Sequence, residues 1–148
     1  WLPALPLLLA ALASVALAHP APVAREQENV SATAAEPFSP ARLQALRDEG
    51  RPVFAYFTAD WCITCKVNER AAIDTDATRA AFRAGNVAVL VGDWTNGDPE
   101  LGRFLEAHGR AGVPLYLYYA PGEEQPRVLP QILTPALLAQ LSAGPDGE

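Results

Sequence analysis

The sequence predicts one α/β domain in which a mixed central sheet is flanked by helices, preceded by an apolar segment and a linker. Three uninterrupted apolar runs, at residues 53–57, 87–91 and 115–119, are typical of strands buried on both faces. Helix start signals separate these runs, so we expect helices to alternate with parallel strands before a closing antiparallel hairpin. The length of 148 residues fits a single domain, and 50% apolar residues are enough for a core.

The predicted helices are marked by capping residues and prolines. They begin at Ser39-Pro40, near residues 74–76, at Asp98-Pro99 and at Thr134-Pro135. Glycines at 50, 85 and 109 end the first three of these helices. A turn at 121–122 joins the third apolar run to a short run at 127–132, which predicts the closing hairpin.

The first 18 residues carry no charge and are apolar almost throughout. We interpret residues 1–18 as the end of a transmembrane helix, close to the lower length limit of a bilayer span. The alternatives are the apolar region of a signal peptide, in which Ala16-Leu17-Ala18 resembles a cleavage site, or a buried helix. Residues 19–37 lack periodicity, which predicts a linker. The folded domain is expected at 38–144, followed by a C-terminal tail at 145–148.

Charge and cysteine content exclude several classes of protein. Eleven basic against seventeen acidic residues give a net charge of −6, which argues against nucleic-acid binding because that requires a basic face. Two cysteines are too few for a disulfide-dense scaffold and cannot alone complete a four-ligand zinc site. The sequence has no methionine, so we expect it to be a piece of a longer protein.

The strongest functional signal is the pair Cys62 and Cys65. The pair lies in the motif Trp61-Cys62-Ile63-Thr64-Cys65-Lys66, which comes shortly after the first predicted strand. A Cys-x-x-Cys pair at a helix start after a strand indicates redox chemistry. The unpaired N–H groups and partial positive charge of a helix N-terminus stabilise a thiolate, which is the reactive form of cysteine. We therefore expect Cys62, at the exposed cap, to attack, and Cys65, more buried, to resolve the mixed disulfide.

Three other interpretations of this pair stay open from the sequence. The cysteines could form a purely structural disulfide, although closing so short a loop restricts the unfolded chain little. A metal site would need further ligands, but His19 lies in the linker and His108 at a helix end. The pair could also be two free thiols in the core.

Val113-Pro114 precedes the third apolar run. A proline at the start of a strand is unusual because it removes a hydrogen-bond donor from the sheet. Pro114 is either an ordinary trans proline that begins a strand or, beside a Cys-x-x-Cys pair, part of a cis-proline loop that faces the dithiol and holds an extended peptide.

These motifs resemble the thioredoxin fold and, more narrowly, the C-terminal periplasmic domain of the DsbD-type thiol:disulfide interchange proteins, including their suppressor-of-copper-sensitivity relatives. Three blocks in order carry the resemblance: Ala59-Asp60-Trp61-Cys62, Asp93-Trp94-Thr95 with Asp98-Pro99, and Gly112-Val113-Pro114-Leu115-Tyr116. The resemblance covers about residues 38–143. It extends to residues 1–18 as the last membrane helix of the central electron-transporting domain.

The resemblance implies a protein-disulfide reductase with no cofactor beyond its redox-active disulfide. In the family, electrons cross the bacterial inner membrane through a membrane-embedded domain, and the C-terminal domain passes them to periplasmic disulfide proteins. Cys62 and Cys65 then correspond to the redox pair and Pro114 to the cis-proline, while Val113 would offer its backbone to the partner as a short added strand. We expect Trp61 to be a surface plate beside Cys62; simple packing is the alternative.

One position departs from the wider thioredoxin pattern. Many thioredoxins carry a buried acid six residues before the first cysteine, which assists proton transfer from the second; here that residue is Tyr56. Glu69, one turn beyond Cys65, is the remaining candidate for proton transfer, and Asp60 is the other nearby acid. Either carboxylate would oppose a nearby thiolate by like-charge repulsion, which suits a reductant. A solvated surface charge is the alternative for both.

Two other functions compete with the reductase interpretation. The same fold could act as a periplasmic oxidase or isomerase, since the reduction potential sets the direction of electron flow and the dipeptide Ile63-Thr64 does not reveal it. A copper or haem-assembly binding protein is the second alternative, but the wider cysteine spacing and nearby histidine of copper-delivery proteins are missing. The downstream partner is left open between an isomerase, a cytochrome-maturation thioredoxin, a peroxiredoxin and a copper-resistance thiol protein.

Overall fold

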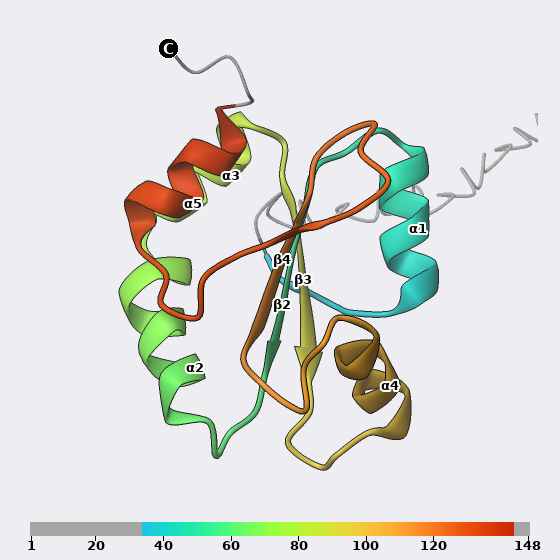
Figure 1. Cartoon of the computed structure of the whole chain (residues 1–148). Helices are drawn as coiled ribbons and strands as arrows, with labels where there is room; N and C mark the ends of the chain where they lie inside the picture. The colour runs from blue at the N-terminus through green and yellow to red at the C-terminus, as the bar shows by residue number, and fades with distance from the viewer. Residues whose placement is uncertain (1–33, 144–148) are drawn as a thin grey trace, which may run out of the picture.

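The computed structural model of the chain describes residues 34–143 (Figure 1). Its elements are, in order, β1 (Glu36–Pro37), α1 (Pro40–Asp48), β2 (Val53–Thr58), α2 (Ile63–Asn68), the π-helical turn η1 (Glu69–Ile73), α3 (Asp76–Ala84), β3 (Ala88–Asp93), α4 (Pro99–Ala107), β4 (Leu115–Tyr119), β5 (Arg127–Val128) and α5 (Pro135–Ser142). The predicted membrane segment at 1–18, most of the predicted linker at 19–37 and the predicted tail at 145–148 lie outside the described residues. Across residues 34–143, no helix has the length and apolar character needed to cross a membrane.

The strands form one five-stranded mixed sheet in the order β1-β3-β2-β4-β5, which confirms the predicted fold class. Strand β2 is central, parallel to β3 and antiparallel to β4. Phe57, near the end of β2, lies opposite Leu115, the first residue of β4. Because the strands are antiparallel, the loop that leaves β2 and the loop that enters β4 meet at the same end of the sheet.

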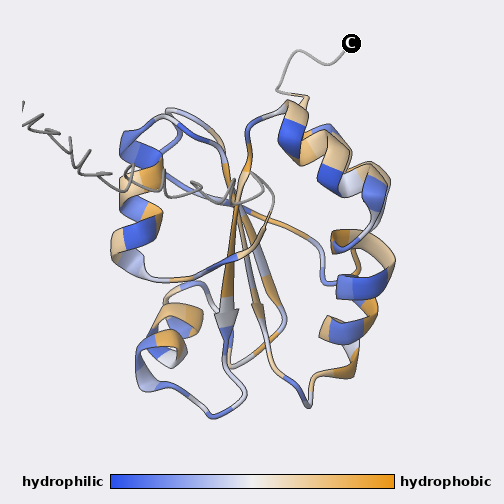
Figure 2. Cartoon of the chain, turned by 180° about the vertical axis from the view of Figure 1, so that it is seen from behind, coloured by the Kyte–Doolittle hydropathy of each residue, from blue (hydrophilic) through white to orange (hydrophobic). Residues whose placement is uncertain are grey.

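Helices cover both faces of the sheet, with α2, α3 and α5 on one side and α1 and α4 on the other (Figure 1). Every residue of β2 and β4 is buried, as uninterrupted apolar runs predict. Alternate residues of β2 enter different cores: Phe54 packs with Phe82 of α3 and Leu138 of α5, whereas Ala55 packs with Leu46 of α1. Both apolar and polar residues occur on each helix, as expected for helices with one buried face (Figure 2).

Side-chain caps begin the helices where the sequence predicts them. The side chains of Ser39, Asp98 and Thr134 accept backbone N–H bonds from the first turns of α1, α4 and α5, and each of these residues is followed by proline. Within the predicted cap at 74–76, Thr75 is the residue that accepts the N–H bond at the start of α3.

Strand β1 corrects one predicted boundary. Glu36 and Pro37 lie in the predicted linker, yet they pair in parallel with β3 at the edge of the sheet. The Arg42 guanidinium donates to the Glu36 carboxylate at 2.7 and 3.1 Å, holds this strand against α1 and lowers the pKa of Glu36. The linker prediction is therefore wrong at residues 36–37, because two residues are too few to show any periodic pattern.

Gly92 of β3 provides a test of how tightly the sheet packs near the end of β2. A Cβ atom at Gly92 would overlap the ring of Phe57, which is fully buried and cannot move aside. We expect Gly92→Ala to lower the free energy of unfolding by about 1–3 kcal/mol, the usual cost of overpacking a core. Chemical denaturation of the variant and the wild type measures this difference.

Gly102→Ala is the matched control. A Cβ at Gly102 would meet nothing closer than 3.7 Å. In a helix interior, alanine is more stabilising than glycine by about 0.5–1 kcal/mol. We expect the control to be as stable as the wild type or slightly more stable. Equal stability of the two variants would contradict the close approach of Phe57 to Gly92.

Candidate active site

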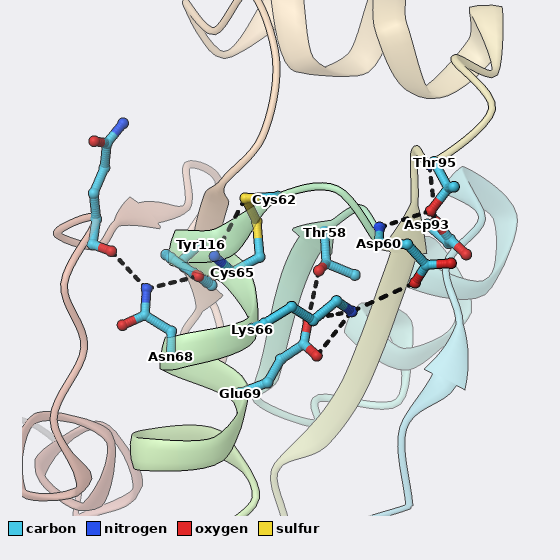
Figure 3. The surroundings of a disulfide bond; sticks show 11 residues. Thr58, Asp60, Cys62, Cys65, Lys66, Asn68, Glu69, Asp93, Thr95 and Tyr116 are labelled. Atoms are coloured by element: carbon cyan, nitrogen blue, oxygen red, sulfur yellow. Dashed lines mark hydrogen bonds and ion pairs between the residues drawn. A yellow bond between two sulfur atoms is a disulfide. The ribbon is translucent and has the colours of Figure 1, made fainter.

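Cys62 and Cys65 form a disulfide at the start of α2, after the loop that leaves β2 (Figure 3). Cys62 is the N-cap of the helix, and its Sγ accepts the backbone N–H of Cys65 at 3.2 Å. The sulfur therefore lies where a capping oxygen normally lies, close to the unpaired N–H groups of the first turn. This position stabilises negative charge on Cys62 Sγ when the disulfide opens.

Both cysteines are buried, with 6% of Cys62 and 1% of Cys65 exposed. The expectation that Cys62 lies exposed at the cap is wrong, because Ala59 and Val113 pack against the two cysteines and cover them. Cys65 is the more buried of the two, as predicted.

The loop that enters β4 supplies the cover over the disulfide. The peptide bond between Val113 and Pro114 is cis, Val113 is partly exposed and Pro114 is buried. Val113 contacts the cysteines because the pairing of β2 with β4 brings the two loops to the same end of the sheet. The structure thus places the predicted redox pair and the predicted cis-proline loop in contact.

Charged groups gather on one flank of α2 (Figure 3). Lys66 Nζ lies 3.1 Å from Glu69 Oε2 and 3.7 Å from Asp60 Oδ1. The hydroxyl of Thr58, the last residue of β2, donates to Glu69 Oε1. Glu69 is therefore a partly buried carboxylate tied to α2 and β2 and not a solvated surface charge, whereas the side chain of Asp60 is 80% exposed.

The other flank of α2 is neutral and buried. The Asn68 side-chain amide donates to the Tyr116 hydroxyl at 2.8 Å and to the Gln131 carbonyl at 2.6 Å, and its oxygen accepts the Leu133 N–H at 3.0 Å. Asn68 therefore joins α2 to β4 and to the segment between β5 and α5. After Asn68 the chain continues into η1, whose first residue is Glu69.

Trp61 lies on the surface, with 58% of the residue exposed, as predicted. Its indole N–H donates to the Thr95 carbonyl at 3.2 Å, and its ring lies edge-on to Trp94 with centroids 6.2 Å apart. The Thr95 hydroxyl accepts the Asp60 N–H at 3.0 Å, and Thr95 in turn donates to Asp93 and lowers the pKa of that carboxyl. The loop after β3 thus holds the loop that carries Trp61.

Sequence reasoning missed four side chains that shape the site, namely Thr58, Lys66, Asn68 and Thr95. Asn68 and Glu69 are consecutive residues, but they reach opposite flanks of α2 and contact different strands. The only available signal was their position three and four residues after Cys65, since side chains at these two spacings lie next to the cysteine, one on each side of it. Nothing in the sequence pairs Thr95 with Trp61.

Chemically, the arrangement supports thiol–disulfide exchange. Among residues 34–143 no group of three or more histidine, cysteine or acidic side chains could hold a metal ion. A disulfide at a helix N-terminus, with one sulfur more accessible than the other and a peptide loop packed beside it, defines a thiol:disulfide oxidoreductase of the thioredoxin fold.

Comparison with known proteins agrees with this class. A family model described as thioredoxin-like matches residues 34–121. Because this match covers more than half of the chain, the protein belongs to the thioredoxin-like family.

Two curated relatives carry the name thiol:disulfide interchange protein DsbD. The chain is 34% identical over 91 residues to DsbD 1 of Pseudomonas aeruginosa and 32% identical over 85 residues to DsbD of Ralstonia nicotianae. These matches cover 59% and 57% of this chain but only 15% and 14% of the relatives. The resemblance to DsbD-type proteins seen in the sequence motifs is therefore confirmed, for a small part of their length.

Solved structures support the fold. The C-terminal domain of Neisseria meningitidis DsbD matches in its reduced form with a TM-score of 0.55 at 21% identity, covering 71% of this chain and 95% of that domain. Its oxidised form matches with a TM-score of 0.54 at 22% identity, covering 72% and 95%. A structure titled DsbH oxidoreductase matches with a TM-score of 0.58 at 13% identity, covering 74% of this chain and 83% of that one.

Buried tyrosines of β2 and β4 make the stability of the domain sensitive to high pH. Burial raises the pKa of Tyr56 to about 12, helped by the charges of Glu69 and Asp74, and burial raises the pKa of Tyr119 to about 12. Burial also raises the pKa values of Tyr116 and Tyr118. The tyrosines of the unfolded chain lose their protons at about pH 10, whereas those of the folded chain keep them. The contribution of the buried tyrosines to the free energy of unfolding is therefore complete below pH ~10 and is lost as the pH rises towards ~12.

We expect phenolate absorbance at 295 nm to rise in the native protein only above pH about 10, together with the loss of helical circular dichroism. The same titration in concentrated guanidinium chloride should give ordinary tyrosine behaviour. A native titration centred near pH about 10 with the circular dichroism unchanged would show that the tyrosines are not buried as described.

Proposed function

We propose that this chain is a protein-disulfide reductase that passes electrons from a membrane-embedded domain of the same protein to disulfide-containing proteins in the bacterial periplasm. The observation that carries the proposal is the Cys62–Cys65 disulfide at a helix N-terminus, packed against Val113, in a domain similar to segments of two DsbD proteins. The membrane-embedded donor, the inner-membrane location and the periplasmic acceptors rest on that similarity.

In the proposed reaction the reduced Cys62 thiolate attacks one sulfur of the partner's disulfide. A mixed disulfide forms between Cys62 and the partner, and the partner's other sulfur leaves as a thiolate. Cys65 loses its proton and attacks Cys62 Sγ, so the Cys62–Cys65 disulfide forms and the partner's second thiolate leaves. Two electrons have passed to the partner, and the membrane-embedded domain reverses these steps to reduce the pair again.

The residues around the pair receive roles in partner contact. Val113 lies beside the disulfide and is partly exposed, so its backbone can pair with an extended segment of the partner. Pro114 has no backbone N–H and ends that pairing on its own side. The exposed ring of Trp61 flanks Cys62 and offers an apolar surface held in place by Thr95.

Two acids are proposed to act in the deprotonation of Cys65, Glu69 as the proton acceptor and Asp60 through its charge. Glu69, the first residue of η1, lies about one turn beyond Cys65 and is held between Lys66 and Thr58, which suits a group that accepts a proton inside the domain. Asp60 is exposed and contacts Lys66, so its charge acts on the site mainly through that lysine. Tyr56 stays protonated across the physiological range, since burial raises its pKa to about 12.

Trapping of intermediates tests the reaction order. We expect Cys65→Ser to accumulate a covalent adduct with a periplasmic thiol protein through Cys62, visible on a non-reducing gel. Cys62→Ser should trap little or nothing, because Cys65 is only 1% exposed. The Cys65→Ser chain should also trap the membrane-embedded domain when both are present. Better trapping by Cys62→Ser, or no adduct with either variant in cells, would overturn the assigned roles and the relay.

Replacement of Glu69 tests the proton step. We expect Glu69→Gln to slow disulfide exchange at neutral pH by about 10- to 100-fold and to change its pH dependence, since positioned general bases contribute effects of this order or larger. Asp93→Asn, which removes a carboxylate bonded to Thr95 instead of one bonded to Thr58, is the comparison and should change the pH profile less than Glu69→Gln does. Superimposable pH–rate profiles for Glu69→Gln and the wild type would remove Glu69 from the mechanism.

A further inference from the structure

Helix α2 has very little buried surface for an element that must hold a reactive pair. Of its residues Ile63–Asn68, only Cys65 and Asn68 are buried, while Ile63 and Val67 are 80% and 55% exposed. The apolar side chains that normally fix a helix to its core therefore point away from it. Apart from the cysteine itself, Asn68 is the buried side chain of this helix.

An asparagine at such a position is unusual, because burying an amide is unfavourable unless its hydrogen bonds are made. Asn68 is 2% exposed and makes three of them, to Tyr116 at 2.8 Å, to the Gln131 carbonyl at 2.6 Å and from the Leu133 N–H at 3.0 Å. Hydrogen bonds are directional, whereas apolar contacts allow a helix to slide and rotate. Three bonds to three partners fix both the position and the rotation of α2 at this point.

One partner of Asn68, Tyr116, belongs to β4, the strand that follows the Val113–Pro114 loop, and the other two lie in the segment between β5 and α5. Tyr116 is two residues beyond Pro114 in the chain, and alternate residues of an extended segment share one face. The Tyr116 carbonyl also accepts the Leu129 N–H at 2.9 Å, which ties the segment bearing Gln131 and Leu133 to the same strand. Asn68 thus connects the helix that carries the cysteines to the strand whose entry loop covers them.

We propose that Asn68 is a positioning residue that sets where Cys62 lies relative to Val113, and so controls exchange with partners that bind as an extended strand. This inference rests on the proposed function. Cys62 lies six residues before Asn68, roughly 9 Å along the helix at 1.5 Å per residue, so a tilt of about 10° about this point would move the sulfur by about 1.5 Å. Misplacement of a reacting group by about 1 Å can lower a rate by about 100-fold.

The test compares a substrate that must dock with one that need not. The full chain is reduced with dithiothreitol and desalted, and second-order rates are measured with a synthetic peptide closed by one disulfide and with hydroxyethyl disulfide. We expect Asn68→Ala to slow reduction of the peptide by about tenfold or more and that of hydroxyethyl disulfide by less than about twofold, because only the peptide requires Cys62 and Val113 in register. Tyr116→Phe, which removes one of the three bonds, should have a smaller effect of the same kind.

Thr78→Val is the matched control. Thr78 of α3 is 1% exposed and donates to the Ala72 carbonyl at 2.6 Å, so this variant also loses a buried hydrogen bond, but away from the cysteines. It should change neither rate. Equal slowing of both substrates by Asn68→Ala, no slowing of either, or the same selectivity loss in Thr78→Val would overturn the proposal.

A second measurement does not depend on activity. Nuclear Overhauser contacts between the Val113 methyl groups and the Cys62 β-protons of the oxidised chain should weaken in Asn68→Ala and persist in Thr78→Val; unchanged contacts in both would contradict a positioning role. If Asn68→Ala does not fold, Asn68→Asp and Tyr116→Phe carry the same comparison. A wild-type chain that fails to reduce the peptide would refute the proposed function, while these contacts would still decide the role of Asn68.

Discussion

The antiparallel pairing of β2 with β4 is the contact on which the site depends. Its register, with Phe57 opposite Leu115, brings the loop that carries the cysteines and the loop that carries Val113 to one end of the sheet. These two segments are separated by about fifty residues in the chain, so no local preference could bring them together. A shift of this register by one residue would turn every side chain of β4 to the other face and separate the loops. The chemistry therefore depends on strand pairing in the buried centre of the domain.

The two flanks of α2 make different kinds of contact. On one flank, Lys66 and Thr58 hold the charged carboxylate of Glu69. On the other, Asn68 makes only neutral bonds to Tyr116 and to backbone groups. The charged contacts and the neutral hydrogen bonds around α2 therefore involve different side chains and different strands.

Most of the fold could be predicted because its signals are local. Buried strands appear as apolar runs, and capping side chains followed by proline mark helix starts within one or two residues. Strand β1 could not be found, because it consists of two residues and exists only through its pairing with β3. The burial of Cys62 was also missed, since it depends on Val113, a residue far away in the sequence. The cysteines are recognisable from spacing alone, whereas the bonds of Asn68 and Thr95 become visible only when distant segments are brought together.

The edges of the sheet are short in the part of the chain that the structure describes. Both outer strands, β1 and β5, contain two residues, and β1 ends in a proline that cannot donate to a neighbouring strand. Long open edges invite pairing with other chains and lead to aggregation. For the proposed function, pairing with an extended partner is wanted at Val113 and not at the edges of the sheet. Because both outer strands are this short, an extended chain finds few unpaired backbone groups at the edges of the sheet. Self-association through these edges is therefore disfavoured.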